Sequence, residues 1–308
     1  MVLEMHPPLC PVVKLYMDGC LEFIWQACSY FVTSRSENFV QVLTLSMLGG
    51  LLGSQSASKD FGENMLSSVA RQAIQQLFTR SESVDVSIRC APASKILQGV
   101  VDSFQMKGRG LVIKKMFEAE AMEFETDAVS LDMSGLIGGK IRLKQATHAI
   151  ATVTMTESGI NKAFTADLVE KHLKDVTSEE ATSMSGGDPV SFRDVQMVLL
   201  PNQRVKITAK TDLPNRDDLP ICLSAEVAVE RRRRVVFTNV EFEPDDVPED
   251  IQWLSEAMIP GFIGVLNQMV DLERFDLDGV SLRVNQLDVK GKQLLFNGYA
   301  EIEHFPGM

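Results

Sequence analysis

Residues 83–90 read SVDVSIRC, and this stretch decides the fold class. Its apolar residues Val84, Val86, Ile88 and Cys90 alternate with polar ones. Successive residues of a β-strand point to opposite faces of a sheet, so a period of two predicts a strand with one buried face. A face of this kind is typical of an antiparallel sheet that is covered on one side.

The same alternation recurs downstream and predicts a meander of short antiparallel strands. In the first half it involves Met122 and Phe124; Val129, Leu131 and Met133; Ile141 and Leu143; and Ala149, Ala151, Val153 and Met155. In the second half it involves Val195, Met197 and Leu199; Val205, Ile207 and Ala209; residues 221–229; Val235 and Phe237; and residues 280–284 and 294–302. A change of parity at Leu287 and Val289 predicts a bulge or bend between the last two strands.

Three segments have the 3.6-residue period of helices instead. They are residues 61–78, residues 157–173 and about residues 248–270, the last with a kink or break at Pro260. Together the two periods predict an α+β fold, with an antiparallel sheet and about three amphipathic helices.

The middle of the chain suggests a division into two halves. Residues 177–188 contain Ser183-Met184-Ser185-Gly186-Gly187 and are predicted to be a linker or exposed loop. Residues 103–113 also align without gaps on residues 286–296, with apolar residues around a shared Lys-Gly-basic pattern. This echo is weak evidence for a duplication, because a generic hairpin turn produces the same pattern.

The first 46 residues differ in composition from the rest. They hold three of the five cysteines, and Met47 opens a segment that reads as an ordinary start. Their most apolar stretch, residues 21–32, is too short and too polar to span a bilayer, and it lacks the basic flank of a signal peptide. We expect residues 1–46 to lie outside the fold and residues 47–308 to form the domain. The alternatives are a membrane-associating helix and a true structural element.

Composition excludes several classes of protein. The chain has 308 residues and a formal net charge of −12, whereas a nucleic-acid-binding protein needs a broad basic face. The five cysteines form no C-x-x-C pair, and their irregular spacing fits a reducing compartment better than a disulfide framework. We therefore expect a cytoplasmic protein that can be peripheral on a membrane.

Motifs for catalysis, metals and cofactors are missing from the sequence. The four histidines are His6, His148, His172 and His304. None has a partner at metal-ligand spacing, and no G-x-S-x-G elbow or phosphate loop occurs. Residues 276–279 resemble part of a calcium loop, but Arg274 and Asn285 stand where its first and last carboxylates belong. We expect no enzyme activity, no cofactor and no metal.

What remains is an excess of apolar surface. The third helix is apolar almost all the way round, whereas a helix that covers a sheet needs only a stripe. It is either buried on two sides or faces an apolar cavity on one of them. The 15 methionines fit a cavity, because thioethers adapt to irregular ligands. The residues predicted to line it are Met122, Phe124, Leu131, Trp253, Met258, Phe262, Leu266 and Met269.

Four adjacent arginines follow the strand predicted at residues 221–229. They are Arg231, Arg232, Arg233 and Arg234. If the strand continues, alternate arginines extend its apolar face; if a turn intervenes, they form a solvated loop. The other interpretation is an anion site, since guanidinium groups bind phosphate bidentately. We predict that at least one of the four contacts an anionic head group or membrane surface.

With these residues in view, the chain resembles the LmeA-like phospholipid-binding proteins of bacteria, in particular a cyanobacterial branch. The matching stretches are residues 60–66 (DFGENML), 94–99 (SKILQG), 124–132 (FETDAVSLD), 229–234 (VERRRR) and 271–280 (DLERFDLDGV). The resemblance covers about residue 47 to the end. It implies phospholipid binding on an elongated, curved β-sheet with helices, similar to tubular lipid-carrier modules, and it transfers no catalytic residues.

Two functions are therefore compared. The first is non-catalytic binding or transfer of phospholipid or another apolar ligand. The alternative is a structural or assembly protein whose apolar helix docks a protein partner. An exposed patch of Trp253 and Phe262 would favour the protein partner, and an enclosed cavity would favour lipid.

Overall fold

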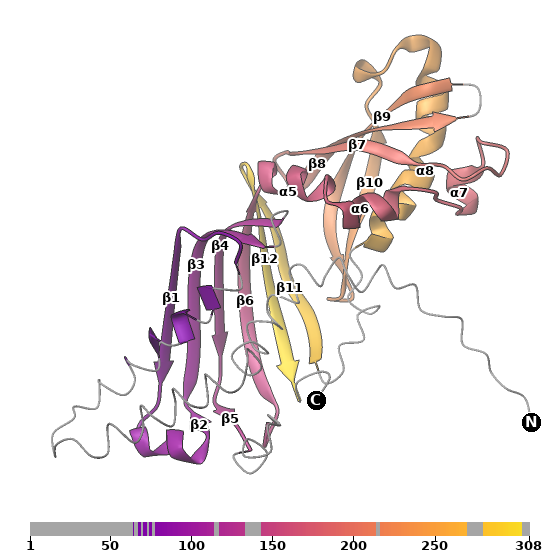
Figure 1. Cartoon of the computed structure of the whole chain (residues 1–308). Coiled ribbons are helices and arrows are strands. Elements are labelled where there is room, and N and C mark those ends of the chain that lie inside the picture. The colour runs from indigo at the N-terminus through magenta and orange to yellow at the C-terminus, as the bar shows by residue number, and fades with distance from the viewer. Residues whose placement is uncertain are drawn as a thin grey trace, which may run out of the picture.

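The computed structural model describes residues 78–113, 117–132, 143–213, 216–269 and 280–303, together with residues 64, 67–68, 70–72 and 74–75. The extension predicted at residues 1–46 and the calcium-like segment at 276–279 lie outside these residues. Within them, the chain forms two large, open antiparallel sheets and several helices (Figure 1). The predicted α+β class is confirmed.

The first sheet has six strands in the order β1-β3-β4-β6-β12-β11. They are β1 (Ser83–Arg89), β3 (Ser103–Ile113), β4 (Phe117–Thr126), β6 (Thr147–Thr156), β12 (Gln293–Ile302) and β11 (Val280–Lys290). In β1 the apolar residues Val84, Val86 and Ile88 are buried and their neighbours are exposed, as the sequence predicts. A two-stranded sheet of β2 (Val100–Val101) and β5 (Val129–Ser130) accompanies it, with the 3-10 helix η1 (Ala93–Gln98).

The last two strands join the first sheet. β12 pairs with β6 along its whole length, from Gln293 opposite Thr156 to Ile302 opposite Thr147. The sequence similarity between residues 103–113 and residues 286–296 does not reflect a repeated structure. Residues 103–113 form the single strand β3, whereas residues 286–296 span a hairpin that turns at Gly291. The predicted bulge is confirmed by a register shift between Val284 and Gln286.

The second sheet has four strands in the order β10-β9-β8-β7. They are β10 (Arg234–Phe242), β9 (Arg216–Glu230), β8 (Arg204–Leu213) and β7 (Phe192–Leu199). The helices are α5 (Glu157–Phe164), α6 (Asp167–Leu173), α7 (Glu179–Thr182) and α8 (Gln252–Met269), with 3-10 turns η2 (Pro244–Asp246) and η3 (Glu249–Ile251). Figure 1 shows the two sheets end to end, with α5 where they meet and α8 along the second sheet.

The helix predictions are partly confirmed. The described residues of segment 61–78 that precede Phe78 are helical, and Ala70 and Ile74 are buried. The single helix predicted for residues 157–173 was wrong. It is divided into α5 and α6, because the Thr165 hydroxyl caps the Lys162 carbonyl at 2.8 Å and Ala166 is extended.

The predicted linker at residues 177–188 contains helix α7, and its Ala181 is completely buried. This segment was predicted to be a linker or an exposed loop, because small polar residues are typical of loops, and residues 186–188 are indeed exposed. Helix α7, by contrast, packs closely against α8. A Cβ atom added at Gly261 of α8 would lie only 2.4 Å from the Cα atom of Ala181. Pro260 does not interrupt α8, which continues to Met269.

Candidate functional site

One face of the six-stranded sheet is lined by apolar residues, apart from Thr126, and we call it the apolar face. Three cross-strand rows define it, in the order β1, β3, β4, β6, β12, β11. They are Val84-Gly108-Met122-Val153-Phe296-Leu287, Val86-Met106-Phe124-Ala151-Gly298-Val284 and Ile88-Phe104-Thr126-Ala149-Ala300-Leu282. Cross-strand neighbours stand about 5 Å apart, so each row is a contiguous contact surface. Adjacent rows also touch, since Phe104 of the third row and Phe124 of the second meet edge to face with ring centroids 6.0 Å apart.

The centre of this face is lined by short side chains. Ala149 and Ala151 of β6 lie directly opposite Ala300 and Gly298 of β12. Larger side chains flank them on both sides, with Phe124 on β4 as one example. These four residues form a floor that is two strands wide. Adjacent strands lie about 4.8 Å apart, so its width is about 10 Å. It is fully apolar, and all four residues are buried.

The predicted cavity residues fall into separate layers of the molecule. Met122 and Phe124 lie on the apolar face of the six-stranded sheet. Leu131 lies outside that sheet, in an isolated bridge to Leu143. The other five belong to α8, which packs on β9 and β10 of the second sheet. The structure therefore does not bring the eight residues together around one cavity.

Helix α8 is buried on two sides. Met258, Phe262, Leu266 and Met269 are buried, and the ring of Phe262 packs on Phe192 of β7 with centroids 4.9 Å apart. Contacts with β9 and β10 on one side and with α7 on the other explain why the helix is apolar almost all round. Trp253, in its first turn, remains 64% exposed. The patch considered for a protein partner does not form, because Phe262 is completely buried.

Arg231, Arg232 and Arg233 form the turn between β9 and β10, and Arg234 is the first residue of β10. Strand β9 ends at Glu230 and β10 starts at Arg234, so the strand does not continue through the run. The Arg233 N–H donates to the Glu230 carbonyl at 3.0 Å, and Arg231 and Arg232 have φ angles of 50° and 60°. Positive φ at both central residues identifies a type I′ turn. Arg231, Arg232 and Arg233 are exposed, whereas Arg234 is half-buried.

This arginine turn, residues 231–234, lies against the edge of the first sheet. The Val284 N–H of β11 donates to the Arg232 carbonyl at 2.7 Å, and the Arg232 guanidinium donates to the Asn285 side chain. Val284 itself is buried in the middle row of the apolar face. The structure thus places a cluster of exposed cations beside the apolar face, a neighbourhood that the sequence alone does not indicate.

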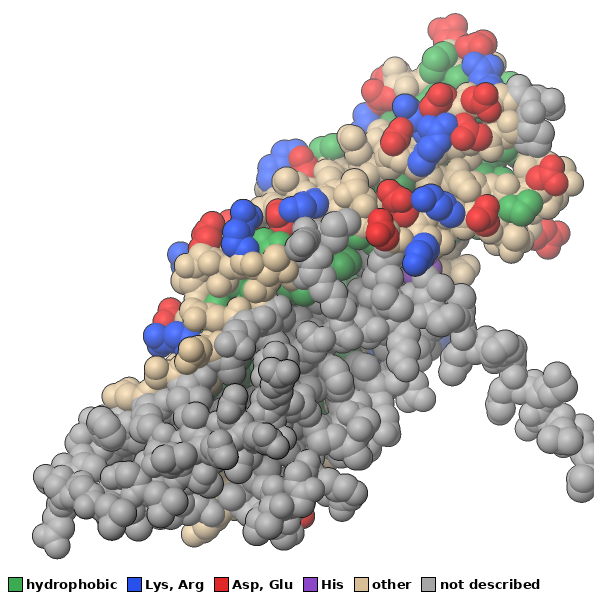
Figure 2. All heavy atoms as spheres, in the orientation of Figure 1, with side chains coloured by type: hydrophobic (Ala, Val, Ile, Leu, Met, Phe, Trp, Pro, Cys, Tyr) green, Lys and Arg blue, Asp and Glu red, His purple; other side chains and the backbone are tan. Residues whose placement is uncertain are grey.

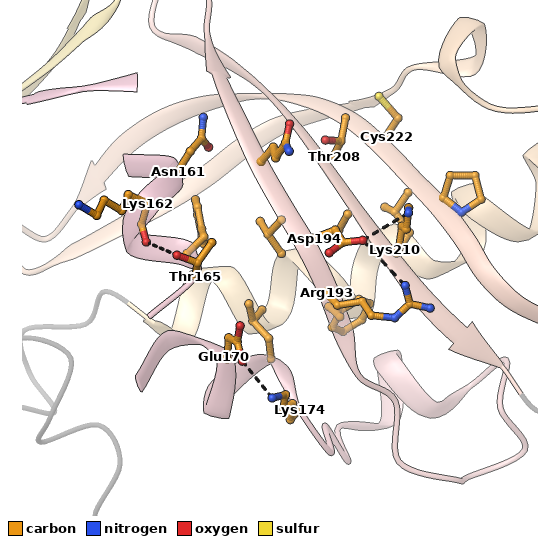
Figure 3. Close-up of a pocket in the computed structure, with 18 of the residues that line it drawn as sticks. Asn161, Lys162, Thr165, Glu170, Lys174, Arg193, Asp194, Thr208, Lys210 and Cys222 are labelled. Carbon is orange, nitrogen blue, oxygen red and sulfur yellow. Dashed lines mark hydrogen bonds and ion pairs between the residues drawn. The ribbon is translucent and has the colours of Figure 1, made fainter. Parts of the chain in front are cut away.

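A groove of about 840 Å³ lies on the second sheet beside α5 and α6 (Figure 3). Apolar residues, including Leu173 and Val195, contribute to its lining together with charged side chains. The charges occur as pairs: Lys174 bonds Glu170 at 3.0 Å, and Lys210 lies 3.3 Å from Asp194. Such a surface is electrically balanced.

Cys222, in the lining of this groove, is a buried thiol. Burial raises the pKa of Cys222 to about 11, and the Lys206 ammonium, which lowers it, only partly offsets that effect. A thiol with this pKa is protonated at neutral pH, whereas a nucleophilic cysteine needs the thiolate. The geometry therefore gives Cys222 the role of a small core residue.

Ion pairs also cover the outer face of the second sheet, where Figure 2 shows acidic and basic side chains intermixed. Arg193 bonds the carboxylates of Asp212 and Asp218, with 2.8 Å to the latter, and both partners raise the pKa of the guanidinium.

His148 lies on the outer face of the first sheet. Its Nδ1 is 2.8 Å from Asp127, and it stacks on Tyr299. No group of three or more His, Cys, Asp or Glu side chains in the described ranges could hold a metal ion.

Helix α5 connects the two sheets through residues that the sequence analysis missed. The Asn161 side chain accepts from the Met197 N–H at 2.7 Å and donates to its carbonyl at 3.0 Å, on the open edge of β7. Glu157 accepts from Leu199 N–H at 2.8 Å and from Lys292 at 2.7 Å. Burial raises the pKa of Glu157, but these two donors outweigh that effect and lower the pKa overall. An Asn or Glu on a helix gives no local signal of a partner so distant in sequence.

These features define an α+β protein built around a broad apolar sheet face with a cationic turn at its edge. The chain belongs to the LmeA-like phospholipid-binding family, whose profile matches residues 57–298. Comparisons with curated proteins and with solved structures found no match. In the part of the chain that the structure describes, no helix combines the length and apolarity needed to cross a bilayer.

Proposed function

We propose that the protein binds phospholipid without chemical turnover, with the acyl chains on the apolar face. The observation that carries this proposal is the registered set of apolar rows, whose centre is lined by Ala149, Ala151, Gly298 and Ala300. The short side chains of the three alanines let a flexible acyl chain approach the sheet backbone, whereas the Phe296 ring stands over Gly298. Taller flanking side chains shield the acyl chain from water. Each methylene group removed from water contributes about 0.8 kcal/mol, so two acyl chains provide ample driving force. The family supports the phospholipid class.

The arginine turn is the proposed head-group site. Arg231, Arg232 and Arg233 are exposed cations in a chain with a net charge of −12. Arg232 is one hydrogen bond from Val284, so a phosphate bound there can belong to a lipid whose chains lie on the apolar face. Near an anionic bilayer each cation contributes about 1 kcal/mol, fading within a Debye length. We propose that the turn orients the acidic protein on such a surface for lipid uptake or transfer.

A role without turnover agrees with the environments of the ionisable groups described above. The thiol of Cys222 has a raised pKa, and His148 lies on the outer face, opposite the apolar rows. The assembly alternative depends on an accessible apolar helix, and α8 offers Trp253 but keeps Met258 and Phe262 buried. The observations therefore favour a lipid ligand over a protein partner for the apolar residues.

The central experiment incubates the purified protein with mixed phospholipids and identifies bound lipid by native mass spectrometry and lipid extraction. Intact phospholipid should co-purify. Accumulation of lysolipid or free fatty acid above a buffer control would show turnover and contradict the proposal.

A matched pair of variants tests the location. Ala151→Leu adds bulk to the apolar floor, whereas Thr152→Leu adds bulk at the next residue, on the opposite face. Ala151→Leu should reduce the co-purified lipid severalfold, and Thr152→Leu should leave it unchanged. Equal lipid content in the two folded variants would place the acyl chains elsewhere.

The head-group site is tested by replacing all four arginines of the turn with Gln. Binding to anionic liposomes should fall selectively, and the loss should be largest at low salt. If the variant and the parent protein bind anionic liposomes equally, the turn is not a head-group site.

A further inference from the structure

Two turns of the second sheet cover the outer edge of β11. Gln203, in the turn between β7 and β8, reaches Leu287, Asp288 and Val289. Arg232, in the turn between β9 and β10, reaches Val284 and Asn285. We call these two contacts the β11 latch. An open strand edge presents unpaired N–H and C=O groups, and the latch covers this one with parts that belong to the other sheet.

The Gln203 contact resembles strand pairing made by a single side chain. Its Nε2 donates to the Leu287 carbonyl at 2.9 Å and to the Asp288 carboxylate at 3.2 Å. Its Oε1 accepts from the Val289 N–H at 2.5 Å. A primary amide has one acceptor and two donor hydrogens, so one side chain can satisfy both backbone groups of this edge.

Strained backbone supports both halves of the latch. Asn202 and Gln203 have φ angles of 60° and 61°, and Arg231 and Arg232 have φ angles of 50° and 60°. Side chains other than Gly, Asn and Asp occupy this left-handed region at a cost, and they do so where surrounding contacts hold them. The latch therefore consists of two turns, with left-handed residues at their centres, that are joined to β11 by five hydrogen bonds.

Helix α5 holds the opposite side of the junction and is covalently continuous with the first sheet. Helix α5 continues directly from β6, and Gly159 lies so close to β4 that a Cβ atom there would be 2.9 Å from the Glu118 carbonyl. Lys162 also bonds the Glu118 carboxylate at 2.5 Å. The same helix holds the edge of β7 through Asn161. Helix α5 can therefore act as the fixed side of a hinge whose other side is the latch.

The latched residues belong to the apolar face. Val284 and Leu287 are buried, and they terminate two of its three rows at the β11 end. We propose that the β11 latch is a gate: its release lets the second sheet move away from β11 and opens a path for acyl chains to these rows. This inference rests on the proposed function. It adds that an anionic head group promotes release by competing with Asn285 for the Arg232 guanidinium.

The test compares Gln203→Ala with a matched control, Gln286→Ala. Gln286 also bonds Asp288, at 2.7 Å, but it lies on β11 itself and does not join the two sheets. Gln203→Met serves as a second latch variant, because it keeps the side-chain volume while removing the hydrogen bonds. Thermal unfolding of the full chain shows that each variant is folded.

Two measurements are made on each variant. Amide hydrogen exchange is followed at Val289 and at Val284, and uptake of a fluorescent phospholipid from anionic vesicles is followed by stopped flow. Loss of the Gln203 side chain removes three hydrogen bonds and should accelerate exchange at both amides at least about tenfold. Lipid uptake should become severalfold faster. The Gln286→Ala variant should match the parent in both measurements.

Two results would contradict the gate. Faster exchange at Val289 alone, with Val284 unchanged, would show that the two turns do not open together. Faster exchange at both amides with an unchanged uptake rate would show that the latch does not control access. Failure of the parent protein to retain any phospholipid at equilibrium would instead overturn the proposed function itself, so the two failures are distinguishable.

Discussion

The double substitution Arg231→Asn with Arg232→Gly separates the charge of the arginine turn from the stability of the fold. Both residues have positive φ angles, of 50° and 60°, at the centre of a type I′ turn. Asn-Gly is the preferred pair for this turn, because neither residue resists the left-handed conformation. The substitution therefore removes two cations from a position where the backbone favours other residues.

The magnitudes follow from the geometry of the turn. A left-handed conformation costs an ordinary residue at least about 1 kcal/mol, so relief at two positions contributes about 2 kcal/mol of stability. Loss of the Arg232 contact with Asn285 offsets about 1 kcal/mol. The free energy of unfolding should thus rise by about 1 kcal/mol. Removal of two cations should weaken binding to an anionic membrane by about 2 kcal/mol, or about 30-fold.

The assay combines urea unfolding with co-sedimentation on neutral and anionic vesicles at low and moderate salt. The control is Arg231→Lys with Arg232→Lys, which keeps both charges and should keep most of the binding. If the Asn-Gly variant is more stable than the parent and still binds anionic vesicles less tightly, misfolding cannot explain the weaker binding. If the Asn-Gly variant bound anionic vesicles as tightly as the parent, the head-group proposal would be refuted.

Three further predictions concern the framework around the site. Gly261→Ala should destabilise the protein by about 2–3 kcal/mol in urea unfolding, because the new Cβ meets α7 backbone atoms; Gly264→Ala, with nothing within 4 Å, should stabilise it by up to about 1 kcal/mol, and equal effects would contradict the packing. Asn161→Leu should cost about 2 kcal/mol, since both hydrogen bonds to Met197 are lost; no change in the unfolding midpoint would argue against this contact. Glu157 has a lowered pKa in the folded state, so it contributes stability above its unfolded pKa, and this contribution disappears as the pH falls through the folded pKa. Glu157→Gln should therefore flatten the acid limb below about pH 4.5 in a pH series of unfolding free energies, and a limb identical to that of the parent would contradict the assignment.

The sequence by itself determined the local geometry and the faces of the elements. The alternation in β1 assigned Val84, Val86 and Ile88 to a buried face, because successive strand residues point in opposite directions. The nearly uniform apolarity of α8 predicted that the helix is buried on more than one side or borders a cavity. The parity change near Leu287 predicted the bulge in β11. These features depend on residues within a few positions of each other.

Only the tertiary structure decided which faces meet. The pairing of β12 with β6 joins Asn297 to Thr152 across 145 residues, and hairpin patterns carry no record of so distant a partner. The local pattern of the arginine run was compatible with a strand or with a turn; the structure shows a turn at Arg231 and Arg232, docked on Val284. Strand pairing and the docking of the arginine turn on β11 use backbone N–H and C=O groups, which every residue except proline carries. The local pattern of side chains therefore does not reveal which distant strand or turn will be the partner.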